Sequence, residues 1–187
     1  MSILIIGGDA KLSKELKKKL ISNKIDFIET SKKNKNNSDK IIYLDYEDIE
    51  SFSIPEKIEK AVVVAYISSY SIFESNQDYS KLICTVKIPY IVEQLLMRNI
   101  YTCFISSNAV FSDTKSIPSE YDTTSPSFHY GIYKSKTEEA ILRISEKLKK
   151  NKFLSILRLT KNVSNDSSPF NQWIKNINKK NDINVFK

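Results

Sequence analysis

Short apolar runs alternate with longer amphipathic stretches along most of the chain. The first run, Ile3-Leu4-Ile5-Ile6, is continuous and ends at a pair of glycines, which predicts a strand buried on both faces. Leucines then recur every fourth residue at Leu12, Leu16 and Leu20 with lysines between them, a pattern typical of an amphipathic helix. We therefore expect the chain to open with a strand, a turn and a helix.

The same alternation continues along the chain. Five more strands are predicted, over 25–28, 41–44, 61–65, 101–106 and 153–157, with 183–186 as one further candidate. Helices are predicted over 79–98 with a kink at Pro89, over 130–149 and over 170–177. Strands that alternate with crossover helices predict an α/β fold, a Rossmann-like doubly wound parallel sheet with helices on both faces. Ligands of such sheets bind at the carboxyl ends of the strands.

Composition narrows the class of protein. The 187 residues are 41% hydrophobic and 27% charged, as in a folded soluble domain rather than a disordered chain. No apolar run approaches the roughly 20 residues of a membrane span, and the N-terminus has no basic leader or signal-peptide cleavage site. Cys84 and Cys103 stand far apart and His129 is the one histidine. These counts exclude a disulfide framework and a Cys/His zinc site, and they favour a reducing cytoplasm.

The charge balance is basic but poor in arginine. The net charge is +7, yet the only arginines are Arg98, Arg143 and Arg158. Proteins that read specific nucleic-acid sequences rely on arginine forks and interleaved aromatic side chains. The lysines lie on predicted helix faces and in loops such as 32–37, so we expect a solvated basic surface and no specific nucleic-acid partner. An anionic small ligand is the alternative use of this charge.

The turn after the first strand, Gly7-Gly8-Asp9-Ala10-Lys11-Leu12-Ser13, lies where a dinucleotide-binding fold needs small residues. Such residues let the backbone approach a pyrophosphate, whose charge the amides of the helix N-terminus bind. Gly7 fits the first glycine position of that motif, whereas Ala10 and Ser13 stand at the second and third. Asp9 adds a negative charge. A dinucleotide turn and an ordinary strand-to-helix turn both remain open.

Tyr130 and Lys134 lie four residues apart on one face of the predicted helix 130–149. An ammonium beside a phenol stabilises the phenolate and lowers a pKa that is ordinarily about 10, as a tyrosine acid/base requires. A YxxxK spacing also occurs in ordinary exposed helices. The spacing is more informative in this chain because a second segment precedes it at the end of a predicted strand, Ile105-Ser106-Ser107-Asn108-Ala109-Val110-Phe111.

Four segments together resemble the extended short-chain dehydrogenase/reductase family. They are Ile5-Ile6-Gly7-Gly8, residues 105–113 (ISSNAVFSD), residues 129–139 (HYGIYKSKTEE) and Leu157-Arg158-Leu159. Their order and spacing are most similar to the dTDP-4-dehydrorhamnose reductase branch, beside the sugar-nucleotide epimerases and dehydratases. The resemblance implies a single NAD(P)-binding domain over residues 1–187, with the C-terminal substrate lobe truncated or absent.

By this resemblance Ser107, Tyr130 and Lys134 are the catalytic residues. A reduced nicotinamide would give hydride to the ketone carbon of a keto-sugar nucleotide while Tyr130 protonates the oxygen. Ser107 would hydrogen-bond that oxygen, and Lys134 would hold the cofactor ribose and tune the tyrosine. The resemblance implies a role in cell-surface polysaccharide biosynthesis and no metal.

The resemblance also implies a cofactor site made of Gly7, Ala10, Lys11, Leu12, Ser31, Lys32, Lys33, Asp45, Ala65, Tyr130 and Lys134. After the second strand, Lys32 or Lys33 offers a point charge to the 2′-phosphate of NADP, whereas Glu29 favours the ribose hydroxyls of NAD. NADP is the preferred expectation, and NAD stays open. Asp45 either lies near the adenine or caps the following short helix.

Other positions depart from the family pattern. Ala65-Tyr66 replaces Asn-Ala-Ala after the fourth strand, and the asparagine position near Thr85 is changed. Arg158 is expected to meet either a phosphate or a helix end. Two functions therefore remain open: the reductase, and a non-catalytic or degenerate module that binds a dinucleotide or sugar nucleotide. A homodimer or a partner chain is expected to supply the missing lobe.

Overall fold

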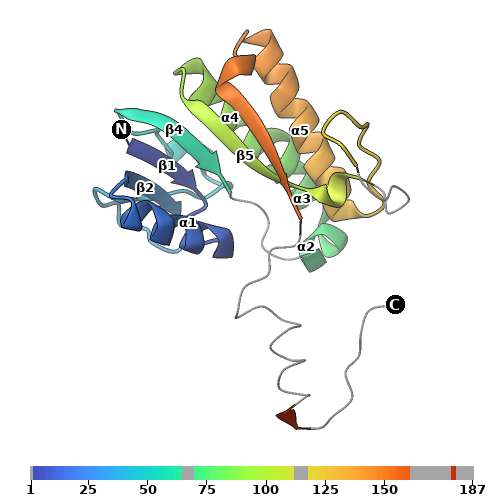
Figure 1. The fold of residues 1–187 in the computed structure, drawn as a ribbon, viewed down its shortest axis with the longest axis horizontal. Coiled ribbons are helices and arrows are strands. Elements are labelled where there is room, and N and C mark those ends of the chain that lie inside the picture. The colour runs from blue at the N-terminus through green and yellow to red at the C-terminus, as the bar shows by residue number, and fades with distance from the viewer. Residues whose placement is uncertain (1, 65–69, 112–117, 161–177, 180–187) are drawn as a thin grey trace.

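The sheet is parallel and doubly wound. The computed structural model describes residues 2–64, 70–111, 118–160 and 178–179 (Figure 1). Within these ranges the strand order is β3-β2-β1-β4-β5-β6. The strands are β1 (Ser2–Ile6), β2 (Asp26–Ser31), β3 (Ile41–Tyr43), β4 (Ile58–Val63), β5 (Tyr101–Ser107) and β6 (Leu154–Leu159). The chain winds outward from β1 in one direction and from β4 in the other, which confirms the predicted Rossmann-like α/β fold.

The helices cover the sheet from both sides. They are α1 (Lys11–Ser22), α2 (Tyr70–Ser75), α3 (Gln77–Leu82), α4 (Ile88–Met97) and α5 (His129–Lys147). Right-handed crossovers that run in opposite directions from the centre of a sheet place their helices on opposite faces, so α1 lies across the sheet from α4 and α5. Figure 1 shows α4 and α5 packed together behind β5. No helix in the described ranges is both long and apolar enough to span a membrane.

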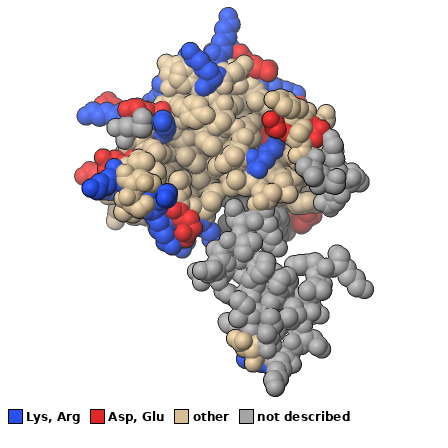
Figure 2. Space-filling model, viewed as in Figure 1, with Lys and Arg blue, Asp and Glu red and all other residues tan. Residues whose placement is uncertain are grey.

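The core lies mainly between the central strands and α4. Leu4, Ile5 and Ile6 of β1 are fully buried, as their continuous apolar run predicts, and Leu4 and Ile6 share one hydrophobic cluster with Phe104 of β5 and Ile141 of α5. Most charged side chains on the face shown in Figure 2 lie toward its edges, with both signs interspersed. No single basic patch covers that face.

Several strand bounds differ from the predicted ones, because ladder pairing extends beyond the apolar runs. β2 continues through Glu29, Thr30 and Ser31, which pair with β3. β6 continues to Arg158 and Leu159, which pair with the end of β5. β4 spans 58–63 instead of 61–65. The predicted helix over 170–177 and strand over 183–186 lie outside the described residues.

The irregularity expected at Pro89 lies in the turn before it. A π-helical turn, η2 (Ile83–Lys87), joins α3 to α4. Pro89 has no backbone N–H for the usual bond to the fourth residue back, and the N–H of Ile88 instead reaches five residues back to the Ile83 carbonyl. This turn carries Cys84, which is fully buried.

Candidate functional site

The turn between β1 and α1 is built around Gly7. Its φ of 93° lies in the left-handed region that glycine tolerates best. Its N–H donates to Thr30 Oγ1 at 2.9 Å, and its carbonyl accepts from the buried Ser13 hydroxyl at 2.7 Å. Ala10 is the N-cap of α1 without a side-chain cap bond, and the first turn carries no acidic residue. The backbone donors that begin α1 are therefore suited to an anion.

Gly8 and Glu29 pack on each other beneath this turn. A Cβ at Gly8 would collide with Glu29 Oε2, so only glycine fits above that carboxylate. The carboxylate is paired with Lys17 at 2.5 Å. Glu29, which was expected to favour the ribose hydroxyls of NAD, therefore forms an ion pair with Lys17.

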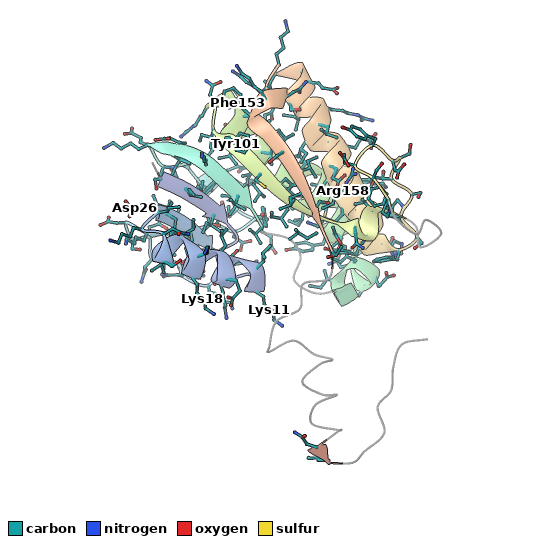
Figure 3. The ribbon with its side chains drawn as sticks, in the orientation of Figure 1. Lys11, Lys18, Asp26, Tyr101, Phe153 and Arg158 are labelled. Carbon is teal, nitrogen blue, oxygen red and sulfur yellow. The ribbon has the colours of Figure 1, made fainter. Side chains whose placement is uncertain are left out.

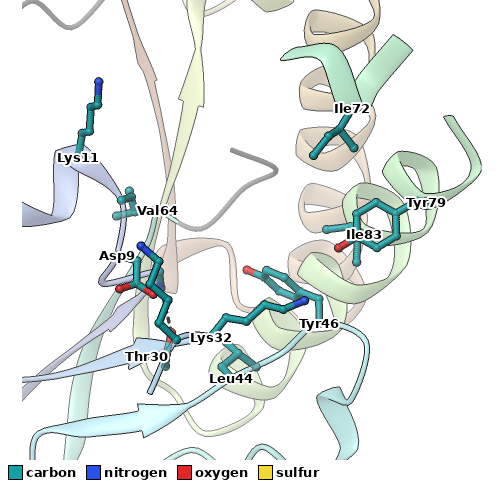
Figure 4. A pocket seen from close by; sticks show the side chains of 13 residues that line it. Asp9, Lys11, Thr30, Lys32, Leu44, Tyr46, Val64, Ile72, Tyr79 and Ile83 are labelled. Carbon is teal, nitrogen blue, oxygen red and sulfur yellow. Dashed lines mark hydrogen bonds between the residues drawn. The ribbon is translucent and has the colours of Figure 1, made fainter. Parts of the chain in front are cut away.

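A cavity of about 930 Å³ lies at the carboxyl ends of the central strands, where the strand order reverses (Figure 4). Its volume is within the range of cofactor sites. Its described lining residues from the β1–α1 turn and from β2 and the segment after it are Gly7, Asp9, Ala10, Lys11, Thr30, Lys32 and Lys33, and its larger apolar and aromatic ones are Leu44, Tyr46, Val64, Ile72, Tyr79 and Ile83. In Figure 4 Ile72, Tyr79 and Ile83 lie across from Asp9 and Lys11. This lining suits a ligand that carries both phosphate and a flat ring.

Lys32 shares its charge with two carboxylates at the edge of the cavity. Its Nζ is 3.0 Å from Asp45 Oδ2 and 3.6 Å from Glu47 Oε1. The hydrogen bond to Asp45 raises the pKa of Lys32. Burial alone would raise the pKa of Asp45, but the Glu47 N–H and the Lys32 ammonium together lower it.

Asp45 does not cap the following short helix, so that alternative is wrong. The 3₁₀ helix η1 (Ile49–Ser51) begins after Asp48. Asp45 Oδ1 instead accepts from the Glu47 N–H at 3.1 Å, which closes a tight turn. The turn points the second carboxylate oxygen at Lys32.

Tyr46 places a hydroxyl in the wall of the cavity. The oxygen is buried and has no hydrogen-bond partner among the described residues. Burial raises the pKa of this phenol. Burying a hydroxyl without a partner is costly, so a ligand with a polar ring edge would satisfy it.

The predicted cofactor residues divide into those at the cavity and those away from it. Gly7, Ala10, Lys11, Lys32 and Lys33 line it. Leu12, Ser31 and Asp45 are not among the described lining residues: Leu12 is half-buried in α1, Ser31 donates to Asp9 Oδ2 at 2.8 Å, and Asp45 holds Lys32. Ala65 lies outside the described residues.

Ser107 ends β5 beside the start of α5. It is the N-cap of the 3₁₀ helix η3 (Asn108–Val110), and its Oγ accepts from the Ala109 N–H at 3.2 Å. A hydroxyl that accepts this bond still has its own proton to donate. Gly131 packs directly over η3, because a Cβ there would collide with the Ala109 carbonyl oxygen. Glycine at this position lets α5 begin next to Ser107.

Tyr130 is held among aromatic rings. Its ring meets Phe73 edge to face with centroids 5.5 Å apart, and it stacks near Phe128 at 6.3 Å. Phe73 is buried in α2 and also packs on Tyr133. These contacts set the orientation of the phenol.

Lys134 is buried, with 3% of its surface exposed. Its Nζ donates to the Ile105 carbonyl at 2.8 Å and lies 4.8 Å from the centre of the Phe104 ring. Burial lowers the pKa of Lys134 to about 7, although Cys84 and Glu138 act to raise it. An amine with this pKa can give and take a proton near neutral pH.

Arg158 pairs with a buried carboxylate and not with a helix end. Its Nη2 donates to Glu138 Oε2 at 2.7 Å, and its Nε lies 3.1 and 3.2 Å from the two carboxylate oxygens. Arg158 pairs with Ser106 in the parallel register, which directs it toward α5. Figure 3 shows it near the end of β6. The predicted contact with a helix end is wrong, because Arg158 pairs with a carboxylate twenty residues away, whereas a phosphate contact stays a prediction.

The two groups of predicted residues adjoin through α2. Ser107, Tyr130 and Lys134 are not among the described residues that line the cavity, but Ile72 lines it and the neighbouring Phe73 packs on Tyr130. The sequence reasoning missed Tyr46 and Glu138. A signal existed for Glu138, since it follows Lys134 by one helical turn; none existed for Tyr46.

Comparison with known families shows to which family the chain belongs. The sequence profile of the family described as "RmlD substrate binding domain" matches residues 1–184. The chain belongs to the RmlD substrate binding domain family. No curated protein matches the chain.

Solved structures share the fold of this RmlD-family chain at low identity. A hypothetical dTDP-4-dehydrorhamnose reductase from Sulfolobus tokodaii has a TM-score of 0.74 and 23% identity, over 91% of this chain and 60% of that one. The dTDP-4-dehydrorhamnose reductase from Bacillus anthracis, in complex with NADP, has a TM-score of 0.72 and 16% identity, over 97% and 61%. MoeE5 in complex with UDP-glucose and NAD has a TM-score of 0.68 and 15% identity, over 83% and 52%. The chain thus spans less than two thirds of each.

Proposed function

We propose that this chain is an NAD(P)H-dependent reductase, or an epimerase or dehydratase with the same site, that acts on a keto-sugar nucleotide in cell-surface polysaccharide biosynthesis. The observation that carries the proposal is the close packing of Gly131 on η3, which sets the start of α5 against the 3₁₀ turn that Ser107 caps. Membership of the RmlD family supports it. The names of the relatives, which include dTDP-4-dehydrorhamnose and UDP-glucose, support the class of substrate.

The cavity fits a nicotinamide dinucleotide. Gly7, Ala10 and the start of α1 suit the pyrophosphate, and Lys32 and Lys33 follow β2, where this fold binds the adenosine ribose. The buried, unpartnered hydroxyl of Tyr46 suits the edge of a base. Bound relatives carry NADP in one case and NAD in another, and the two lysines make NADP the preferred cofactor. When bound, the reduced cofactor supplies a hydride.

The chain's own residues would supply the proton that the ketone oxygen receives. Tyr130 donates its phenolic proton to the ketone oxygen, and the Ser107 hydroxyl hydrogen-bonds the same oxygen. Lys134, buried and with a pKa of about 7, returns a proton to the phenolate. One hydride and one proton are consumed for each alcohol formed, so the reaction balances.

The test separates binding from turnover. NADPH and NADH are titrated while nicotinamide fluorescence is followed, and turnover is measured with a dTDP-linked keto-sugar. Tyr130→Phe should lower turnover by at least about 100-fold with nearly unchanged cofactor affinity. Tyr133→Phe, one turn away in the same aromatic group, is the matched control and should retain turnover. If neither cofactor binds, the proposal is wrong.

Binding without turnover is the second candidate. It is favoured by the absence of Ser107, Tyr130 and Lys134 from the described lining of the cavity. A wild-type protein that binds a dinucleotide but reduces no keto-sugar nucleotide, alone or with a partner chain, would establish this module and overturn the reductase.

A further inference from the structure

Lys134 and Glu138 are neighbours on α5, and each makes hydrogen bonds to another element of the fold. They lie four residues apart on one helix face, and both are buried, with 3% and 2% of their surfaces exposed. A lysine and a glutamate at this spacing commonly form an ion pair. Here the Lys134 ammonium donates to the Ile105 carbonyl, and the carboxylate receives three contacts within 3.2 Å from Arg158.

Arg158 is itself held on several sides. Its guanidinium lies 4.9 Å from the centre of the Phe111 ring, and Nη1 donates to the Glu120 carbonyl at 3.2 Å. One side chain on β6 therefore contacts the segment after η3, the segment before α5 and α5 itself. A planar guanidinium can bind a carboxylate through two parallel hydrogen bonds while its flat face lies against an aromatic ring, a fork geometry that an ammonium lacks.

We propose that Arg158 is a positioning residue that takes the Glu138 carboxylate away from Lys134 and so leaves the Lys134 ammonium on β5, where it exchanges its proton with Tyr130. The inference deepens the proposed function, on which its catalytic meaning rests. Without Arg158, the buried Glu138 carboxylate would have Lys134 as its nearest cation. The pair would then hold the proton on the lysine.

The groups that face Lys134 come from each element packed against it. Among the described residues, the titratable groups that act on its charge include Cys84 from η2 and Glu138 one turn ahead, and β5 presents the Phe104 ring and the Ile105 carbonyl. Of these, Glu138 is the carboxylate. Arg158 forms an ion pair with this carboxylate.

The test measures the protonation of Lys134 directly. The protein is labelled with ¹³C-lysine, its side-chain resonances are followed by NMR across pH, and the Lys134 signal is assigned by its loss in Lys134→Met. Arg158→Met should raise the pKa of Lys134 by about one unit, a tenfold gain in proton affinity. Arg158→Met with Glu138→Gln should bring that affinity back to within about twofold of the wild type. Arg143→Met removes an exposed arginine that pairs with Glu139 on the same helix, and it should change nothing.

A second variant keeps the test decisive if Arg158→Met does not fold. Arg158→Lys retains a cation but loses the fork, and it should raise the proton affinity of Lys134 by about threefold. An unchanged Lys134 titration in Arg158→Lys, or a shift in Arg158→Met that the double variant does not reverse, would overturn the inference. Because the NMR readout needs no cofactor, the inference and the reductase can fail independently. If the protein binds no dinucleotide, the proposed reductase is refuted, but the Lys134 titration still tests the role of Arg158.

Discussion

Two lysines at opposite ends of the candidate site show opposite responses to their surroundings. The side chain of Lys32 is 58% exposed, and its hydrogen bond to Asp45 raises its pKa. Lys134 is 3% exposed, and burial lowers its pKa to about 7. Each has a carboxylate nearby. The difference is that Asp45 bonds to Lys32, whereas Glu138 bonds to Arg158.

Burial and the hydrogen-bond partner of the nearby carboxylate together set the pKa of each lysine. An exposed ammonium bonded to its neighbouring carboxylate keeps its proton and is suited to hold an anion in place. A buried ammonium whose neighbouring carboxylate is taken by arginine is destabilised by desolvation and is suited to proton transfer. In the proposed reductase, the exposed lysine would bind the cofactor and the buried one would take part in proton transfer.

The largest expected effect follows from breaking the buried pair. Arg158→Met leaves the Glu138 carboxylate without its guanidinium and should lower the free energy of unfolding by about 3–5 kcal/mol. Arg143→Met breaks an exposed pair on the same helix and should cost less than about 1 kcal/mol. Urea unfolding of both variants measures the difference. Equal losses would mean that burial does not distinguish the two pairs.

The next effect is a pH dependence of stability that comes from Lys134. Its folded pKa of about 7 lies below its ordinary 10.5, so between these values the unfolded chain binds a proton that the folded chain does not. Stability contributed by this group therefore rises with pH across that window. Relative to Lys134→Met, the wild type should gain about 3 kcal/mol in unfolding free energy from about pH 7 to about pH 9.5.

Urea unfolding at both pH values tests this slope. Lys147→Met, which removes an exposed lysine from the same helix, should leave the slope of the wild type intact. A slope in Lys134→Met as steep as that of the wild type would show that another group causes it.

A smaller effect is expected from Gly131→Ala. The added Cβ meets the Ala109 carbonyl oxygen and the Pro126 ring, neither of which is the end of a flexible side chain. α5 would have to move away from η3, at a cost of about 1–3 kcal/mol, and the start of α5 that carries Tyr130 would shift with it. Thermal unfolding and turnover are measured together. Lys136→Ala, exposed on the same helix, is the control, and a fully active Gly131→Ala would contradict the close packing.

The smallest effect is expected at the exposed end. Glu47→Gln removes one of the two carboxylates that face Lys32 and should improve NADPH binding relative to NADH by about two- to fivefold. Lys32→Ala should shift the same ratio in the opposite direction. Fluorescence titration with both cofactors measures it, with Glu50→Gln as a control that does not line the cavity. If neither substitution changes the ratio of NADPH to NADH affinity, Lys32 does not bind the 2′-phosphate.

The order of strands and helices was predictable because it depends on local patterns. The continuous apolar run of β1 and the leucine spacing of α1 each reflect a backbone period and burial on known faces. The strand ends were less predictable. Polar residues such as Glu29 and Arg158 carry no strand signal and join the sheet only because a neighbouring strand pairs with them.

The sequence alone therefore determined the fold class, the turn at Gly7 and the helix face that Tyr130 and Lys134 share, since each follows from residues within a few positions of one another. Only the tertiary structure decided that Lys17 holds Glu29, that Asp45 holds Lys32 and that Arg158 holds Glu138. These pairs join residues 12 to 20 positions apart. Their formation depends on which strands lie side by side and on how deeply each charge is buried. Neither can be inferred from residues within a few positions of one another.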